Sequence, residues 1–329
     1  MEENSNQNKT KQDHLNDFIK SQEQNDIISK PPIINTESEI QYFGQNVRKK
    51  VDTIEVDNWI NIPLKTLPYN KFYQINTQIY IKPLTTKEKQ AFAVVDENNP
   101  LDVSNKLNQV FKTCVKVLLP DGSRGSYRDI MDGDKQTLAL ALAKLSAKNG
   151  RKFEHKVKNS NGEEVAIEMI PANYVYPKEH EDIKEFFNEE TRVYEFKNPS
   201  NNDVIKLAPP TIGLTEDLHV YLYKKSIESK GQDIPSVSFI QNILYMQSGK
   251  GVRNITTEQF QQIEFEFEKI NGDRFEVIVD VVENYLDFGI KKIKTQSSTG
   301  EMVEADFRYP GGARNLFIVP NAFKKFIGQ

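Results

Sequence analysis

The stretch from Asp134 to Met169, DKQTLALALAKLSAKNGRKFEHKVKNSNGEEVAIEM, contains a change of hydrophobic period that decides the fold class. Its first part repeats apolar residues at the spacing of an amphipathic helix, at Leu138, Ala141, Leu142 and Leu145. From Phe153 onward the period is two, and Asn161-Gly162 supplies the turn of a β-hairpin. A helix followed directly by a hairpin predicts a protein of the α+β class.

The same order of elements recurs along the chain. A hairpin is expected over 193–207, helices begin near Thr215, Thr256 and Asp273, and a last hairpin turns around Thr299-Gly300. We therefore predict an α+β fold with two related units, each built from a strand, amphipathic helices and a closing β-hairpin. The predicted boundaries are an extended polar arm over 1–46, a first unit over 47–175, a second unit over 176–312 and an apolar C-terminal docking segment over 313–329.

The predicted N-terminal arm differs in composition from the rest of the chain. Residues 1–46 are rich in Asn, Gln, Lys, Asp and Ser and contain few aromatic residues. Such a segment alone buries too little apolar surface to offset its conformational entropy. We interpret it as an arm that becomes ordered when it meets a partner.

Polar residues mark the expected helix starts. Thr85 and Thr256 each stand three residues before a Glu or Gln, which is the pattern of a capping box. Asp134 is expected to cap the helix that follows it by accepting a backbone N–H. In the helix expected from Thr215, the next two residues are acidic and would lie in the first turn, where the helix dipole favours them.

The composition fits a globular protein with a polar excess. The chain has 329 residues, of which 37% are hydrophobic and 27% charged, and its formal net charge is -4. This charge provides no global attraction for nucleic acid. No apolar stretch approaches bilayer length and no secretion signal is visible, so we expect a protein made and used in the cytoplasm, or packaged in a particle assembled there.

No motif for catalysis or metal binding is recognised. Residues 248–251, SGKG, lack the upstream glycine and the Ser/Thr after Lys of a phosphate-binding loop, so we expect an exposed turn. The four histidines are far apart and lack metal-ligand spacing. The single cysteine, Cys114, lies in an apolar run that is typical of a buried residue. We therefore expect no catalytic residues, no cofactor, no metal and no small-molecule substrate.

Two stretches near the start of the predicted fold carry a resemblance to a known family. Residues 67–73, LPYNKFY, form a Pro/Asn turn flanked by aromatic residues, and residues 79–88, IYIKPLTTKE, form a strand and a capped helix start. This series resembles the opening of the T-even-type phage baseplate protein family, which has a Leu-Pro-Ser-Lys-Gly-x-x-Tyr turn, a strand and a Pro-Leu-Thr-x-Lys-Glu helix start. The helix after Asp134, the segment 205–221 and the helix over 275–289 resemble later elements of that family.

The chain differs from that family at its two closing hairpins. Many relatives carry Cys-x-x-Cys-Gly there, as in zinc ribbons. The corresponding residues here are 158–162, KNSNG, and 296–300, QSSTG, which retain the glycine and lack both cysteine pairs. Because Lys, Asn, Gln and Thr cannot replace a thiolate cage for zinc, we expect metal-free hairpins that are held by turn chemistry and packing.

The resemblance implies a structural or assembly role in the baseplate hub of a contractile phage tail, and it carries over no catalytic residues. The implied partners are other phage baseplate or tail proteins, and the implied location is the virion, after synthesis and assembly in the host cytoplasm. We expect neither a membrane nor nucleic acid as a partner.

Three alternatives stay open at this point. One is a transient tail-assembly chaperone that is absent from the mature virion. Another is an enzyme with an unrecognised site. The third is a nucleic-acid-associated protein derived from a zinc-ribbon ancestor, for which the local support is Lys291, Lys292 and Lys294 near the last hairpin.

Both ends of the chain carry residues that we expect to bind partners. They are Leu316, Phe317, Phe323 and Phe326 in the C-terminal segment and Phe18 and Ile33 in the arm. So many apolar side chains at a terminus favour a surface that something covers. The alternative is that the C-terminal segment folds back on its own domain, and the sequence does not distinguish the two.

Overall fold

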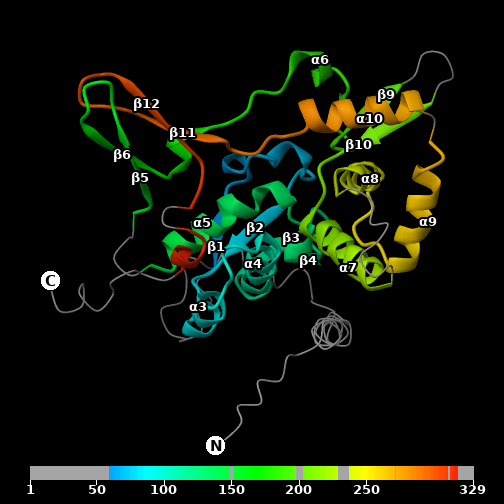
Figure 1. Ribbon diagram of the computed structural model, residues 1–329, viewed down its shortest axis with the longest axis horizontal. Helices are drawn as coiled ribbons and strands as arrows, with labels where there is room; N and C mark the ends of the chain where they lie inside the picture. Colours follow the sequence, from blue (N-terminus) through cyan, green and yellow to red (C-terminus); the bar gives the residue numbers. More distant parts are fainter. Residues whose placement is uncertain are drawn as a thin grey trace, which may run out of the picture. The chain divides into compact units, whose positions relative to one another are not determined.

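The computed structural model describes residues 59–147, 152–197, 203–228, 237–270, 272–309 and 312–317. Helices and antiparallel sheets both contribute to the fold, which confirms the predicted α+β class (Figure 1). The predicted arm over 1–46 lies outside the described residues.

The first sheet has four antiparallel strands in the order β1-β2-β3-β4. They are β1 (Ile60–Ile62), β2 (Gln78–Ile81), β3 (Val115–Leu118) and β4 (Arg124–Gly125). The helices α3 (Thr86–Ala93) and α4 (Pro100–Cys114) connect β2 to β3, and α5 (Lys135–Leu145) follows β4. Successive side chains of a strand point to opposite faces, and Ile79, Ile81 and Val117 are buried in the core on one of them.

A second group of elements lies at the right of Figure 1. A three-stranded sheet in the order β10-β9-β8 is formed by β8 (Phe187–Asn188), β9 (Val193–Lys197) and β10 (Val204–Leu207), which follow the short helix α6 (Glu181–Lys184). Beside it lie α7 (Ile212–Glu228), α8 (Val237–Gly249), α9 (Thr257–Phe267) and α10 (Gly272–Tyr285). The β9–β10 hairpin confirms the one predicted over 193–207.

Two further hairpins lie side by side at the upper left of Figure 1. One pairs β5 (Glu154–Lys158) with β6 (Glu164–Glu168), and the other pairs β11 (Lys292–Gln296) with β12 (Met302–Asp306). Both confirm predicted hairpins. The strand β7 (Tyr174–Val175) joins the second hairpin, because Lys292 is paired with Val175 and Ile293 with Tyr174.

This pairing links the two predicted units, over 47–175 and 176–312, across their boundary. The sheet β12-β11-β7 contains strands from both segments, and the described residues from 59 to 317 belong to one compact unit by their contacts. An isolated bridge between Met131 and Thr211 joins the segments a second time. The two predicted units therefore share a sheet, and their hairpins have the same design.

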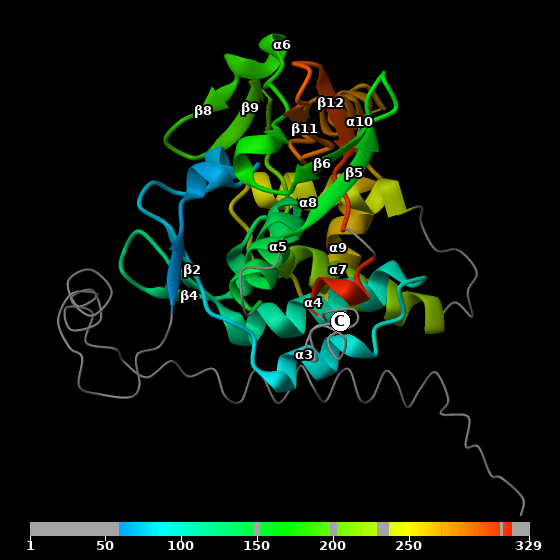
Figure 2. The ribbon, with the colours of Figure 1, turned by 90° about the vertical axis from the view of Figure 1, so that its left-hand side faces the viewer.

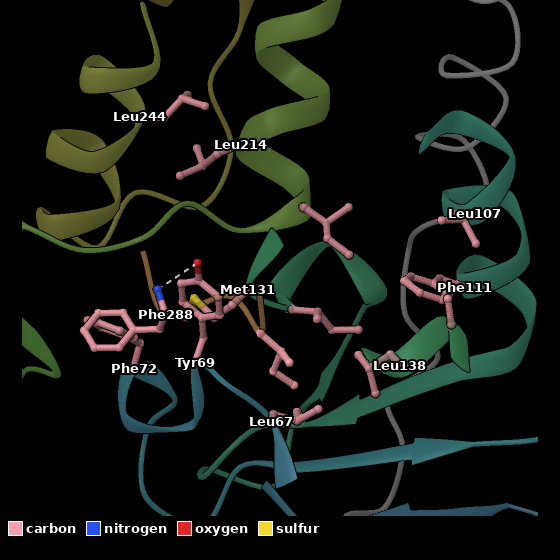
Figure 3. Close-up of a cluster of buried hydrophobic side chains, with 14 of the residues drawn as sticks. Leu67, Tyr69, Phe72, Leu107, Phe111, Met131, Leu138, Leu214, Leu244 and Phe288 are labelled. Carbon is pink, nitrogen blue, oxygen red and sulfur yellow. Dashed lines mark hydrogen bonds between the residues drawn. The ribbon is translucent and has the colours of Figure 1, made fainter. Parts of the chain in front are cut away.

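The turn LPYNKFY over 67–73 lies where the parts of the fold meet. Asp134 is fully buried, and its carboxylate accepts the backbone N–H of Tyr69 at 3.0 Å and the hydroxyl of Tyr73 at 2.8 Å. The Tyr69 hydroxyl in turn accepts the backbone N–H of Phe288 at 3.2 Å, which Figure 3 shows as a dashed line. The ring of Tyr69 covers Gly133 so closely that a Cβ there would lie 2.0 Å from it. The turn thus contacts the start of α5 and the segment after α10.

Lys71 of the same turn binds the elements around β8 and β9. Its ammonium group lies 2.5 Å from the Glu179 carboxylate, 2.7 Å from the Tyr194 hydroxyl and 3.8 Å from the centre of the Phe187 ring. Burial lowers the pKa of Lys71, and the Glu179 carboxylate opposes that change. The charged form of Lys71 is stabilised by its ion pair with Glu179 and by cation–π contact with the surrounding aromatic rings.

The helix starts predicted near Asp134 and Asp273 are confirmed by α5 and α10, whereas the capping role of Asp134 and the start at Thr215 are corrected. Capping boxes at Thr85 and Thr256 precede α3 and α9 as expected. Asp134 makes no side-chain cap, because its carboxylate is turned into the core toward Tyr69 and Tyr73. The helix expected from Thr215 begins at Ile212 instead. The two acidic residues after Thr215, Glu216 and Asp217, form ion pairs with Arg128 at 2.9 and 2.6 Å.

Further differences concern residues 115–118 and 237–249. The apolar run after α4 forms the strand β3, and α8 has no predicted counterpart. The turn expected at 248–251 is only half correct, because Ser248 is buried and Gly249 packs against the backbone of Lys206, whereas the two residues that follow are exposed.

The buried Asp134 predicts a pH dependence of stability. Burial raises its pKa from 3.8 to about 7, against the opposite effect of the bonds from Tyr69 and Tyr73. The folded protein therefore binds this proton more tightly than the unfolded chain, so the stabilisation is complete below about pH 4 and is lost as the pH rises to about 7. A shift of this size corresponds to roughly 4 kcal/mol in the free energy of unfolding.

Urea unfolding at a series of pH values between 4 and 7 tests this directly. Asp134→Asn keeps an acceptor for the Tyr69 N–H and cannot ionise, so its free energy of unfolding should fall much less over this range than that of the wild type. Asp306→Asn, an exposed carboxyl on β12, should retain the wild-type slope. Equal slopes for the wild type and Asp134→Asn would contradict the assignment.

Candidate functional site: two paired hairpin turns

The turn between β5 and β6 is organised by a buried asparagine. The side-chain oxygen of Asn159 accepts the backbone N–H groups of Asn161 at 3.0 Å and Glu163 at 2.8 Å, and its carbonyl accepts the N–H of Gly162. Gly162 has a φ of 80°, which is readily adopted only by glycine. One side-chain oxygen therefore accepts two backbone N–H groups of its own turn and stabilises the turn from the inside.

The turn between β11 and β12 repeats this arrangement with a buried serine. The hydroxyl of Ser297 accepts the N–H of Glu301 at 3.1 Å, and its carbonyl accepts the N–H of Gly300. Gly300 has a φ of 85°, close to that of the glycine in the first turn. The two turns therefore share their backbone geometry although their residues differ.

A carboxylate joins the two turns. Glu301 accepts the hydroxyl of Ser160 at 2.7 Å and the backbone N–H of Ser160 at 3.1 and 3.2 Å. These residues are 141 positions apart in the sequence. We call this contact the carboxylate clasp. Below it, His155 Nε2 lies 2.8 Å from the carbonyl oxygen of Arg308, so that the hairpins also meet at their base.

The residues of the paired turns do not fit a zinc ion. Structural zinc sites are formed by Cys and His side chains, whereas the inward side chains here are an amide and a hydroxyl. Their oxygen atoms already accept N–H groups of their own turns. In the described part of the chain, no three His, Cys, Asp or Glu residues gather in a way that could hold a metal ion.

The outer faces of the two hairpins carry ion pairs. Lys156 lies 2.6 Å from Glu164, and Lys292 lies 3.0 Å from Glu304. Lys291 is also paired, at 2.6 Å from Asp287. Two of the three lysines that supported a nucleic-acid role therefore have carboxylates as neighbours, which reduces the positive potential that a phosphate backbone would meet.

The structure places the C-terminal candidates Leu316 and Phe317 in the core of the chain itself. Their side chains are 1% and 5% exposed, and the Phe317 ring meets the ring of Phe92 in α3 edge-on at 4.8 Å. This is the alternative that the sequence left open, and it leaves these two side chains no free surface for a partner. Phe323, Phe326, Phe18 and Ile33 lie outside the described residues.

The residues of the clasp were not among those predicted from the sequence, although a signal for them exists. The turns read NSNGE over 159–163 and SSTGE over 297–301, so each has a small polar residue three positions before the glycine and a glutamate after it. This shared pattern marks both turns. It does not reveal that Glu301 turns toward Ser160, because that contact depends on tertiary packing.

Comparison of the chain with models of known protein families, with curated proteins and with solved structures finds no match. Within the described residues, no helix has the length and apolar character needed to cross a bilayer.

The clasp predicts a local change when Glu301 is replaced. Glu301→Ala removes the acceptor of the Ser160 N–H and hydroxyl, which costs about 1 kcal/mol for an exposed charged hydrogen bond. Hydrogen exchange of the Ser160 amide should accelerate about fivefold, since local opening governs such exchange. Glu304→Ala is the matched control, because it breaks an ion pair on the same hairpin away from the turns. Unchanged exchange in Glu301→Ala would contradict the clasp.

Proposed function

We propose that this protein is a structural or assembly component of the baseplate of a contractile phage tail and acts by binding other proteins. The observation that carries the proposal is the pairing of the two hairpin turns. Many members of the family that the sequence resembles carry a cysteine pair in each of these turns. Two cysteine pairs can bind one zinc ion only if the turns lie together. Here the turns at 158–162 and 296–300 are joined by Glu301 and Ser160.

The order and roles of the preceding elements also support the proposal. The LPYNKFY turn, the strand β2 and the capped helix α3 follow one another as the resemblance requires. The turn binds Asp134 and Phe288, two residues that belong to segments with later family resemblance. These contacts give the motif a structural role in the fold, which supports the proposal.

The polar clusters of the described residues favour binding over catalysis. Arg128 is held by Glu216 and Asp217, and Glu216 also accepts the side-chain N–H of Asn108 at 2.8 Å. These groups connect α4 and α7 and are occupied by one another. A hollow of about 590 Å³ beside the hairpins is lined by residues that include His155, whose ring nitrogen is bonded to a backbone carbonyl. Such an arrangement lacks the activated nucleophile that covalent catalysis needs.

The proposal predicts a defect in particles that are assembled without this protein. Electron micrographs should show arrested tails or tails without baseplates, because a missing hub component or assembly factor blocks the steps that follow it. Resupplying the wild-type protein in trans should restore normal tails. Normal tails in its absence would contradict the proposal.

Mass spectrometry of purified virions separates the two forms of the proposal. Presence in the particle supports a structural component, and absence together with the assembly defect supports a transient chaperone.

A further inference from the structure

A hollow of about 360 Å³ lies beside the LPYNKFY turn. Its walls come from the end of that turn, from β3 and the residues after it, from the segment before α5 and from the connection between α8 and α9. Figure 2 shows β2 and β4 at one side of the described part of the chain. The apolar lining consists of Phe72, Tyr73, Val117, Leu119, Pro120 and Met131. Ligand pockets range from roughly 300 to 1,000 Å³, so a hollow of this size suits a small ligand.

Arg253 lines this hollow without a partner of its own. Among the residues that the structure describes, none forms an ion pair or a hydrogen bond with its guanidinium group. Arg128, Arg192 and Arg274, which are also partly buried, each lie 2.6 Å from a carboxylate. Burial raises the pKa of the Tyr73 hydroxyl and the charge of Arg253 opposes that shift, so this cation acts on the wall of the hollow. A partly buried guanidinium without an acceptor favours an anionic group on the ligand.

Two carboxylates also line the hollow. Asp121 accepts the backbone N–H of Ser123 at 2.9 Å, and Asp129 accepts that of Ser126 at 2.8 Å. Each bond holds the carboxylate on its own turn and uses one of its two oxygen atoms. The other oxygen can accept a further donor. The hollow therefore offers a site for a cationic group as well as for an anionic one.

From these observations we infer that the hollow binds a small zwitterion with an apolar side chain, and that a free apolar α-amino acid such as leucine is the class of ligand that fits. The ligand carboxylate contacts Arg253. Its ammonium group contacts the carboxylates of Asp121 and Asp129. Its side chain packs between Leu119 and Met131, where apolar surface is removed from water.

Ligands that lack one of these three parts fit less well. An anion would meet two carboxylates, a cation would meet Arg253, and an uncharged apolar compound would leave the guanidinium unpaired. Because no bond holds the long side chain of Arg253, it can adjust to the length of the ligand. The inference goes beyond the proposed function and does not depend on it, and it concerns a bound ligand rather than a substrate.

Met131 allows a test at the hollow itself, because it is one of the lining residues. The full-length protein is isotope-labelled at the methyl groups of methionine, and L-leucine is added at millimolar concentration while NMR spectra are recorded. We expect a saturable shift of the Met131 signal, which is assigned by its loss in Met131→Leu. The signal of Met302, which is exposed on β12, should not move.

Three analogues test the three parts of the ligand. Leucinamide lacks the carboxylate, isocaproate lacks the ammonium group, and L-serine has both charges but no apolar side chain. Each should bind about tenfold more weakly than L-leucine, because each loses one of the contacts.

Two variants assign these contacts to residues. Arg253→Gln should weaken L-leucine binding about tenfold and leave leucinamide binding unchanged, because only the carboxylate contact is lost. The double variant Asp121→Asn, Asp129→Asn should weaken L-leucine binding and not isocaproate binding. Arg308→Gln, an exposed arginine outside this hollow, is the control and should bind as the wild type does. An unchanged signal of the buried Met169 shows that each variant is folded.

Three results would overturn the inference. One is the absence of a saturable Met131 shift at millimolar L-leucine. Another is an equal affinity for isocaproate or L-serine and for L-leucine, which would mean that the ligand is not an apolar zwitterion. The third is a folded Arg253→Gln variant that binds L-leucine as tightly as the wild type does.

Discussion

The fold depends on a buried carboxylate. Asp134 has no exposed surface, and it accepts hydrogen bonds from Tyr69 and Tyr73, which lie 65 and 61 residues before it. A buried carboxylate is costly unless it is hydrogen-bonded, so these partners must stay in place whenever the group is charged. They belong to the LPYNKFY turn, whose Tyr69 hydroxyl binds the N–H of Phe288 and whose Lys71 binds Glu179. Through this turn, the helix α5, the sheet around β9 and the segment after α10 are held together.

The paired hairpins show that two turns with different inward side chains can adopt the same backbone geometry. Asn159 and Ser297 each direct an oxygen to the backbone N–H groups of their own turn, and a glycine with positive φ closes it. Glu301 then connects the turns through Ser160. Hydrogen bonds of this kind contribute about 1 kcal/mol each, so packing of the inner strand faces must supply much of the stability of the paired hairpins.

Local features of the fold could be predicted from the sequence, and distant contacts could not. The three hairpins and the capping boxes at Thr85 and Thr256 depend on neighbours within a few residues, and all are present. Asp134 has the sequence context of a helix cap, yet its acceptors serve two tyrosines more than sixty residues away. The strand β3 was not predicted, because its apolar residues follow directly on the apolar residues at the end of α4 and the sequence shows no break between them. For the candidate site, the shared pattern of the two turns can be seen in the sequence. The contact of Glu301 with Ser160 cannot be predicted from it, because that contact depends on tertiary packing.

The contacts of the LPYNKFY turn and the shared sheet β12-β11-β7 predict that both halves of the described chain unfold as a single cooperative unit. Scanning calorimetry of the full-length protein tests it most directly, because the ratio of the van't Hoff enthalpy to the calorimetric enthalpy reports the size of the cooperative unit. We predict one transition with a ratio near one, since Lys71 and Tyr69 connect elements from both halves. Two separable transitions, one for each predicted unit, would contradict a single cooperative fold.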